Sequence, residues 1–169
     1  MAPGREVTLG EPDGLAAWML RFRLLQAREI RETHAAWIAE TKPRFGPEVQ
    51  ERFDWVMSLT EDATLAEAAE LRPQFAERMT QMLADDGAIC LPTAPDIAPL
   101  TSASAEGLRD HRSRVLSLTC PAGLAGLPQV TLPLAQRAGC PLGISLIGPA
   151  GSDLGLLKLA VRFARVQDS

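Results

Sequence analysis

The amino-acid sequence predicts an α/β fold in which several helices precede short strands, an antiparallel hairpin and a final helix. Residues 13–86 repeat apolar side chains at helical spacing. Residues 87–169 instead place short apolar runs between closely spaced Gly and Pro, as in GLAGLPQVTLPLAQRAGCPLGISLIGPAGSD at 123–153. This change in texture divides one domain of 169 residues into a helical half and a strand-and-loop half.

Three helices are expected in the helical half. The first has Asp13 as its N-cap. The second opens with Pro47, which suits a first helical turn. The third begins at a capping box of Thr64 and Glu67 and is kinked by Pro73, which lacks a donor for the helical ladder. The three predicted inward faces are Leu15, Trp18, Met19, Phe22 and Leu25; then Val49, Phe53, Val56 and Met57; then Leu71, Phe75, Met79, Met82 and Leu83.

The strands are expected in the second half of the chain. AICLP at 88–92 predicts a buried strand, and a further strand is expected earlier, near Val7. QVTLPL at 129–134 and LGISLI at 142–147 are joined by a short link, which predicts an antiparallel hairpin with Pro133 at a strand end or an edge. The predicted buried side chains of the hairpin are Val130, Leu132, Ile144 and Leu146.

Loops and helices connect these strands. The Pro-rich run PTAPDIAP at 92–99 predicts a stiff loop, and LRDHRSRVLSL at 108–118 predicts a short helix. PTAP is also compatible with an extended recognition peptide, but the apolar strand before it favours the loop. Asp153 is the expected N-cap of the last helix, whose predicted inward face is Leu154, Leu157, Val161 and Ala164.

Composition excludes some classes of function. The formal net charge of −4 gives no electrostatic case for nucleic acid or an anionic membrane as a partner. The three cysteines are odd in number and lack CxxC spacing, which indicates free thiols in a reducing compartment. The sequence shows no signal peptide and no apolar run of membrane-spanning length, so a cytoplasmic location is expected.

Five sequence blocks occur in an order that resembles the amidase signature family. They are RLLQAREIRETHAAWI at 23–38, PEVQERF at 47–53, LPTAP at 91–95, LTCPAGLAGLPQVTLPL at 118–134 and CPLGISLIGPAGSDLGLLKLA at 140–160. The resemblance implies the C-terminal part of the amidase-signature fold, with helices packed on a mixed sheet. It also implies that the intact enzyme hydrolyses a small amide to a carboxylate and ammonia or an amine, through an acyl-enzyme and without a metal or organic cofactor.

The same resemblance implies that the catalytic residues are absent from this chain. Family members use a Ser–Ser–Lys triad, but no Gly/Ser-rich nucleophile block occurs here, and neither Lys42 nor Lys158 fits the strand position of the base. The isolated chain is therefore expected to be inactive. By family position, the candidate substrate-binding residues are Thr93, Thr119, Cys120 and Gly123, where Gly123 replaces an Asn that many members carry.

Three sharper hypotheses compete with plainer ones. Ser145 in GISLIG approaches a nucleophile elbow, but the second Gly comes one residue late, which favours a strand serine on a polar face. Cys120 with His111 could form a catalytic pair, although nothing in the sequence orients the His. His34 could bind a metal, but with only two His in the chain an exposed helix residue is favoured.

Two rival functions stay open. The chain could be a non-catalytic binding or assembly module that complements another half-enzyme, or a truncated gene product. Whichever function holds, the chain made alone is expected to be marginally stable and to self-associate or need a partner that supplies an N-terminal half, because its apolar helix faces and strand edges would lack cover.

Overall fold

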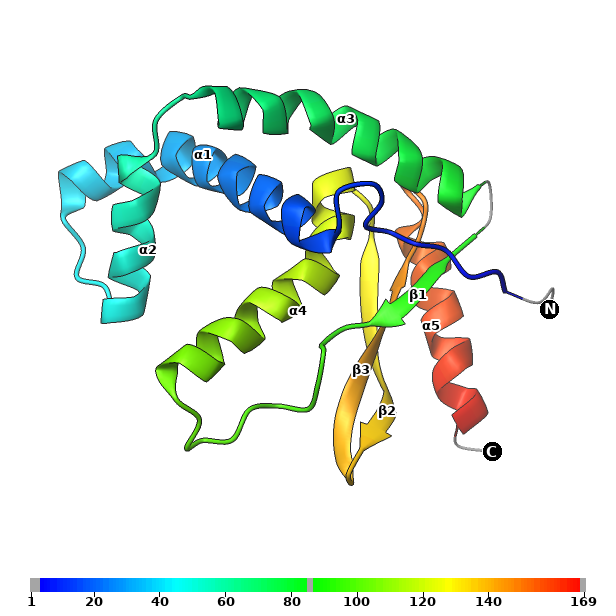
Figure 1. Ribbon diagram of the computed structural model, residues 1–169. Coiled ribbons are helices and arrows are strands. Elements are labelled where there is room, and N and C mark those ends of the chain that lie inside the picture. Colours follow the sequence, from blue (N-terminus) through cyan, green and yellow to red (C-terminus); the bar gives the residue numbers. More distant parts are fainter. Residues whose placement is uncertain (1–3, 85–86, 168–169) are drawn as a thin grey trace. The chain divides into compact units, whose positions relative to one another are not determined.

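The computed structural model describes residues 4–84 and 87–167 and confirms the predicted α/β class (Figure 1). Its elements are α1 (Leu15–Thr41), α2 (Pro47–Ser58), α3 (Ala63–Leu83), β1 (Ile89–Pro92), α4 (Ala105–Ala125), β2 (Gln129–Arg137), β3 (Cys140–Ile147) and α5 (Asp153–Gln167). The chain divides into two compact units, one of residues up to 19 and from 72 onward, the other of residues 20–71. All strands and all predicted site residues lie in the first unit.

Within the unit of residues 20–71, α2 is organised by an aromatic stack. Phe45, in the loop before α2, stacks on Phe53 with ring centroids 4.7 Å apart. Pro47 opens the helix as predicted, and Val56 is buried. The prediction for Val49 is wrong: this side chain is 42% exposed, and the aromatic stack lies one turn further along the helix, at Phe53.

α3 begins before the predicted capping box. The Asp62 Oδ1 atom accepts the backbone N–H of Leu65 at 2.9 Å, so Asp62 caps the helix. The prediction of Thr64 with Glu67 is therefore wrong, and both side chains are exposed inside the helix. The helix runs through Pro73 to its end. Its predicted inward face is confirmed by three buried side chains, Phe75, Met79 and Leu83.

Two other N-caps lie one residue away from their predicted positions. α1 begins after Gly14, whose carbonyl accepts the first helical N–H, so Gly14 holds the cap position in place of Asp13. α5 begins at Asp153 itself, so Ser152 holds the cap position. Asp153 still favours the helix, since a carboxylate in the first turn complements the helix dipole.

The first unit contains an aromatic centre made by the start of α1 and the second half of α3. The rings of Trp18 and Phe75 lie with centroids 4.4 Å apart, and both side chains are buried. The Arg78 guanidinium lies 5.2 Å from the centroid of the Trp18 ring, a cation–π contact. The apolar spacing that predicted these two helices thus marks a real packed face.

β1, β3 and β2 form a three-stranded sheet in that order, with β3 in the centre (Figure 1). The predicted hairpin is confirmed, with Val130 opposite Leu146, and all pairings of the described strands are antiparallel. A bulge between residues 132 and 135 contains Pro133, which lies on an edge strand where its missing N–H is tolerated. Among the described residues Val7 lies in no strand, because its segment turns directly into α1.

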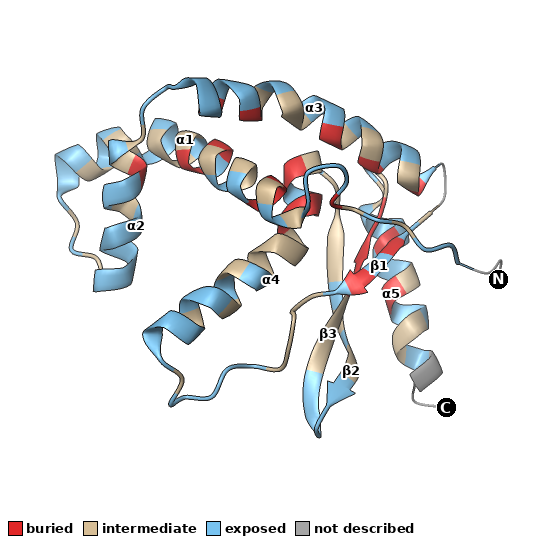
Figure 2. Ribbon diagram, in the orientation of Figure 1, coloured by how far each residue is buried: buried red, intermediate tan, exposed pale blue. Residues whose placement is uncertain are grey.

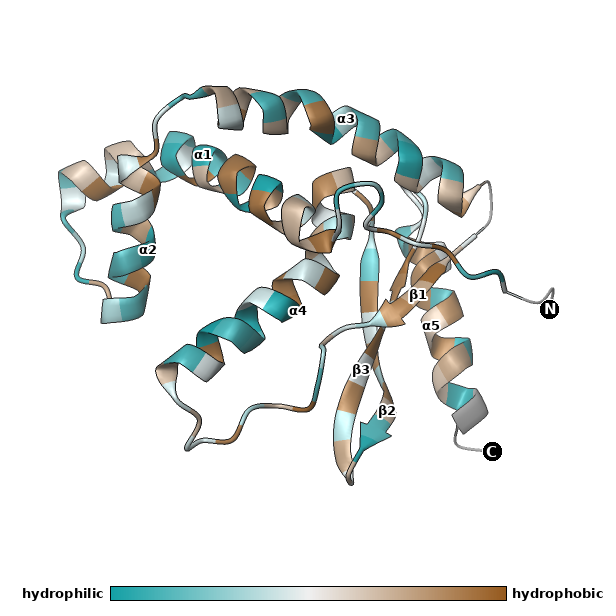
Figure 3. Cartoon of the chain, viewed as in Figure 1, coloured by the Kyte–Doolittle hydropathy of each residue, from teal (hydrophilic) through white to brown (hydrophobic). Residues whose placement is uncertain are grey.

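α5 packs on β2 and β3 with a face other than the predicted one. Leu156 and Ala160 are 5% and 4% exposed, whereas the predicted inward residues Leu154, Leu157 and Val161 are 73%, 53% and 51% exposed. The helix therefore carries apolar side chains on both a buried and an exposed side (Figures 2 and 3). Burial of the face with Leu156 and Ala160 against the sheet is the interaction that orients α5.

α4 is much longer than the short helix predicted over residues 108–118. The Ser104 hydroxyl caps its start by accepting the backbone N–H of Gly107 at 3.1 Å. It ends at Gly126, which adopts left-handed geometry with φ 69°. The backbone N–H of Leu127 then bonds to the carbonyl of Ala122 at 2.9 Å, which closes the helix end. No described helix has the length and apolar character needed to cross a membrane.

Candidate functional site

Thr93 lies directly after β1 and is held to the central strand by two hydrogen bonds. Its backbone N–H donates to the carbonyl of Gly143 at 2.9 Å. Its hydroxyl lies 2.7 Å from the Ser145 Oγ atom. A Cβ atom at position 143 would lie 2.9 Å from the Thr93 Oγ1 atom, closer than side-chain carbons approach. Gly143 therefore provides the space that the Thr93 hydroxyl occupies.

Ser145 is the centre of a hydroxyl and carboxamide cluster on one face of the sheet. Its side chain is fully buried. The Gln129 Nε2 atom donates to Ser145 Oγ at 2.8 Å, and the Thr131 hydroxyl lies 3.1 Å from the same atom. With Thr93, these residues form what we call the Ser145 cluster: Thr93, Gln129, Thr131 and Ser145. The register explains the arrangement, because Thr131 lies directly opposite Ser145 and points to the same face.

Ser145 lies in a strand among polar side chains, as predicted, but it is enclosed, because β3 is the central strand. The competing hypothesis of a nucleophilic Ser145 lacks support in the geometry. A serine nucleophile needs an adjacent base, and the three side chains that contact the Ser145 hydroxyl are neutral. Ser145 is a strand serine whose hydroxyl is fully used inside the protein.

The other three predicted site residues lie in the last two turns of α4. The Thr119 hydroxyl donates to the carbonyl of Val115 at 3.0 Å, one turn back in the same helix. Cys120 is buried, and Gly123 is exposed. Among the described residues, Thr93 bonds to β3 while Thr119 bonds only within α4. The structure thus places the four candidates at two locations that hydrogen bonds do not join.

Cys120 lacks the environment of a reactive thiol. Burial raises the pKa of its thiol from 9.0 to about 12, so the thiolate is not formed near neutral pH. His111 belongs to the same helix, nine residues earlier, which is about 14 Å along the axis. The pairing of Cys120 with His111 is therefore wrong, since a helix keeps the two side chains apart.

His34 is an exposed residue of α1, as the plainer hypothesis states. Its ring meets the ring of Trp37 edge-on at 6.4 Å between centroids. Within the ranges that the structure describes, no group of three or more His, Cys, Asp or Glu side chains could hold a metal ion.

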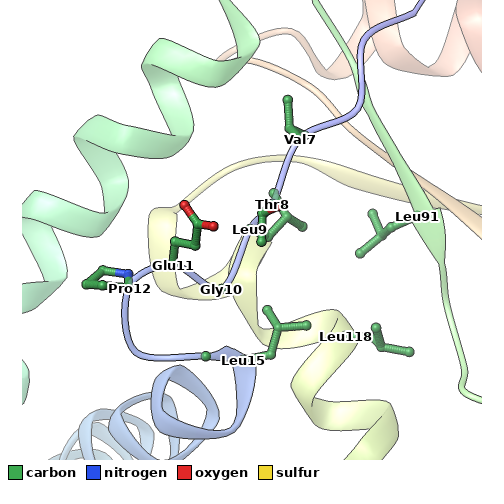
Figure 4. A pocket seen from close by; sticks show the side chains of 10 residues that line it. Val7, Thr8, Leu9, Gly10, Glu11, Pro12, Leu15, Leu91 and Leu118 are labelled. Atoms are coloured by element: carbon green, nitrogen blue, oxygen red, sulfur yellow. The ribbon is translucent and has the colours of Figure 1, made fainter.

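A cavity of about 430 Å³ lies between the N-terminal segment, β1 and α4 (Figure 4). Residues of the stretch 7–15 form one wall, and Leu91 of β1 and Leu118 of α4 form the others. In the sequence, Leu91 lies two residues before Thr93, and Leu118 directly precedes Thr119. The lining is mainly apolar, and it contains none of the four predicted site residues.

Gln129 and Thr131 are polar site residues that sequence reasoning missed. Their alternation with apolar neighbours indicates the outer side of the hairpin, whereas the structure turns both toward Ser145. The Arg72 Nε atom donates to the carbonyl of Leu124 at 3.1 Å and so ties α3 to the end of α4. The alternation does signal that Gln129, Thr131 and Ser145 share a face, once the register is known.

Comparison with known proteins places this fold and these residues in a family. The sequence model of the Amidase family matches residues 13–157. "Amidase 1" of Arabidopsis thaliana is 34% identical over 86% of this chain and 34% of its own length. "Amidase 1" of Oryza sativa subsp. japonica is 33% identical over 82% of this chain and 32% of its own length.

A solved structure agrees with these relatives. The crystal structure of an amidase superposes with a TM-score of 0.77 and 26% identity, covering 96% of this chain and 37% of the other. The chain spans about a third of the length of the relatives that it matches. Because the family match extends over most of the sequence and the relatives and a solved amidase agree with it, the chain belongs to the amidase signature family.

Proposed function

We propose that this chain acts as the C-terminal portion of a cytoplasmic amidase-signature hydrolase, which cleaves amide C–N bonds to a carboxylate and ammonia or an amine. The observation that carries the proposal is the family match over residues 13–157 together with the similarity to a solved amidase. The chain's contribution is a wall of the substrate site, for which Thr93, Thr119, Cys120 and Gly123 are the candidates. No metal or organic cofactor takes part.

The chemistry of the chain's own groups supports a contribution without catalysis. Ser145 is enclosed by neutral partners, and Cys120 is held protonated. Lys42 and Lys158, the only two lysines, are both exposed, so neither is set in the desolvated position that a catalytic base requires. The nucleophile and base of the reaction would come from another part of the enzyme.

A second candidate function is an assembly module that complements a half-enzyme. The exposed apolar side of α5, formed by Leu154, Leu157 and Val161, favours it, since solvated stripes of this kind often mark contact surfaces. On this view the chain contributes affinity for a partner and no substrate contact. The same surface accounts for an expected self-association of the isolated chain.

Reconstitution tests the first proposal. The chain is assayed for ammonia release from simple aliphatic and aromatic amides, alone and fused behind the N-terminal two thirds of an amidase relative. We expect no turnover alone and clear turnover in the fusion, which a substitution of the fusion's nucleophile abolishes. Thr119→Val in the fusion should lower kcat/KM, because it changes the proposed wall of the site.

Two outcomes would contradict the proposal. Turnover by the isolated chain would show that it carries its own nucleophile, and loss of that turnover in Cys120→Ser would identify the thiol. A fusion that folds and assembles but does not hydrolyse amides would favour the assembly module.

A further inference from the structure

The Ser145 cluster has unused hydrogen-bonding groups that follow from counting its donors and acceptors. A serine hydroxyl offers one donor and two acceptor positions. The carboxamide N–H of Gln129 occupies one acceptor position. The remaining donor and acceptor serve the hydroxyls of Thr93 and Thr131, so one threonine donates to Ser145 and the other accepts from it. Whichever threonine accepts keeps its own O–H free to donate.

The cluster also has a spare acceptor. Within the described part of the chain, the carboxamide of Gln129 bonds through its nitrogen to Ser145, and its oxygen accepts no hydrogen bond. Gln129 and Thr93 are half-buried and Thr131 is exposed, so these groups can be reached from solvent while Ser145 beneath them is enclosed. One free hydroxyl donor and one free carboxamide acceptor therefore lie around a single fixed oxygen.

We propose that the Ser145 cluster is a binding subsite for a carboxamide group. A carboxamide presents a carbonyl acceptor next to an N–H donor, which matches the free threonine O–H and the free oxygen of Gln129. A carboxylate has two acceptors and no donor, so the Gln129 oxygen would oppose it, and an alcohol offers one atom where two are needed. The choice of ligand deepens the proposed amide-hydrolase function and rests on it, whereas the position of the subsite rests on the hydrogen bonds.

The cluster is rigid enough to select such a ligand. Ser145 is bonded to side chains of β2 and of the segment after β1, so three stretches of chain are joined at one atom. The backbone N–H of Thr93, which donates to the carbonyl of Gly143, holds the backbone of this residue to β3 as well. Groups held in place before binding lose little conformational freedom when the ligand arrives.

Binding is tested on the chain as it is, without any hydrolysis, so a failure here is distinct from a failure of the proposed function. Benzamide is titrated into ¹⁵N-labelled protein while the Gln129 side-chain NH₂ signal and the backbone amides of Thr131 and Ser145 are followed. We expect saturable shifts with benzamide, and binding at least about tenfold weaker with benzoate or benzyl alcohol.

Gln129→Leu removes the spare acceptor and should weaken benzamide binding about tenfold, read on the backbone amides. Gln136→Leu is the matched control, because Gln136 is an exposed glutamine of the same strand outside the cluster. If Gln129→Leu does not fold, the double variant Thr93→Val with Thr131→Val removes the hydroxyl donors, and the same loss is expected. No shift with benzamide, equal binding of the three probes, or equal effects of Gln129→Leu and Gln136→Leu would overturn the proposal.

Discussion

Replacing Ser145 with Ala should lower the free energy of unfolding by a predictable amount. The substitution keeps the Cβ atom and removes one oxygen, so packing changes little and the loss falls on three hydrogen bonds. The three partners of Ser145 differ in how well water can replace the hydrogen bond that each one loses. Thr131 is exposed and can bond to water, whereas the carboxamide N–H of Gln129 and the hydroxyl of Thr93 are half-buried.

The size of this loss in unfolding free energy is set by Gln129 and Thr93, the two partners that water reaches poorly. A buried polar group left without a partner costs about 1–3 kcal/mol, and a half-buried group recovers part of this from solvent. Two such groups give a loss of about 2 kcal/mol for Ser145→Ala. In a protein of this size, that loss corresponds to a decrease in Tm of about 4–8 °C.

Urea unfolding followed by circular dichroism measures this loss. The midpoint of Ser145→Ala should fall while the slope m stays unchanged, since the surface exposed on unfolding is the same. Ser102→Ala is the matched control: Ser102 is exposed in a loop, and its variant should stay within about 0.5 kcal/mol of the parent. If Ser145→Ala unfolded like Ser102→Ala, the cluster would not stabilise the sheet, and the geometry argued for it would be wrong.

Three further predictions concern a thiol, two glycines and an arginine. In the folded protein Cys120 should resist a thiol reagent at pH 8, while the two exposed cysteines react. Burial raises the pKa of the Cys120 thiol from 9.0 to about 12, so its contribution to the stability of the fold is complete below pH 9.0 and is lost as the pH rises from 9.0 toward 12. The urea midpoint should fall over that pH range. Fast labelling of all three thiols before unfolding would contradict this. Gly143→Ala should lower the free energy of unfolding by about 1–3 kcal/mol, because the added methyl group would meet the two threonines of the cluster. Gly155→Ala is the control: this position on α5 faces open space, so the variant should be about 1 kcal/mol more stable. Equal effects of the two substitutions would refute the contact at Gly143. Arg72→Met should cost about 1.5–3 kcal/mol, because it leaves the carbonyl of Leu124 without its charged donor, and an unchanged midpoint would show that this bond contributes nothing.

The elements with one consistent signal were predictable from the sequence. The hairpin needed only two alternating runs and a short link, whereas its register, with Val130 opposite Leu146, is a finding of the structure. The length of α4 was not predictable in this way, because Pro121 resembles a helix end. In the structure the helix continues through Pro121. Pro121 has no N–H to donate to the carbonyl of Ser117, and the Cys120 sulfur lies 3.9 Å from that carbonyl oxygen. Gly126, five residues later, is the actual end.

The candidate site was predictable only in part, because its members meet across the sheet. The family resemblance pointed to Thr93, but no spacing in the sequence connects this residue with Gln129. Alternation placed Ser145 and Thr131 together on one face and could not tell whether that face is solvated. The answer depends on strand order: β3 lies between β1 and β2, so a serine that resembles a surface residue becomes the enclosed member of the cluster.

α5 shows why a periodic pattern alone cannot decide which helix face is buried. Its sequence offers two apolar stripes, one through Leu154, Leu157 and Val161 and another through Leu156 and Ala160. The first stripe has more apolar surface, yet the second is the one against the sheet. Gly148 contributes to this choice, because a Cβ atom there would lie 3.3 Å from a Leu156 methyl carbon and only 2.5 Å from the hydroxyl oxygen of the cap residue. The glycine after β3 thus lets the start of α5 approach with the Leu156 side inward, a constraint set by the turn before the helix and not by the helix itself.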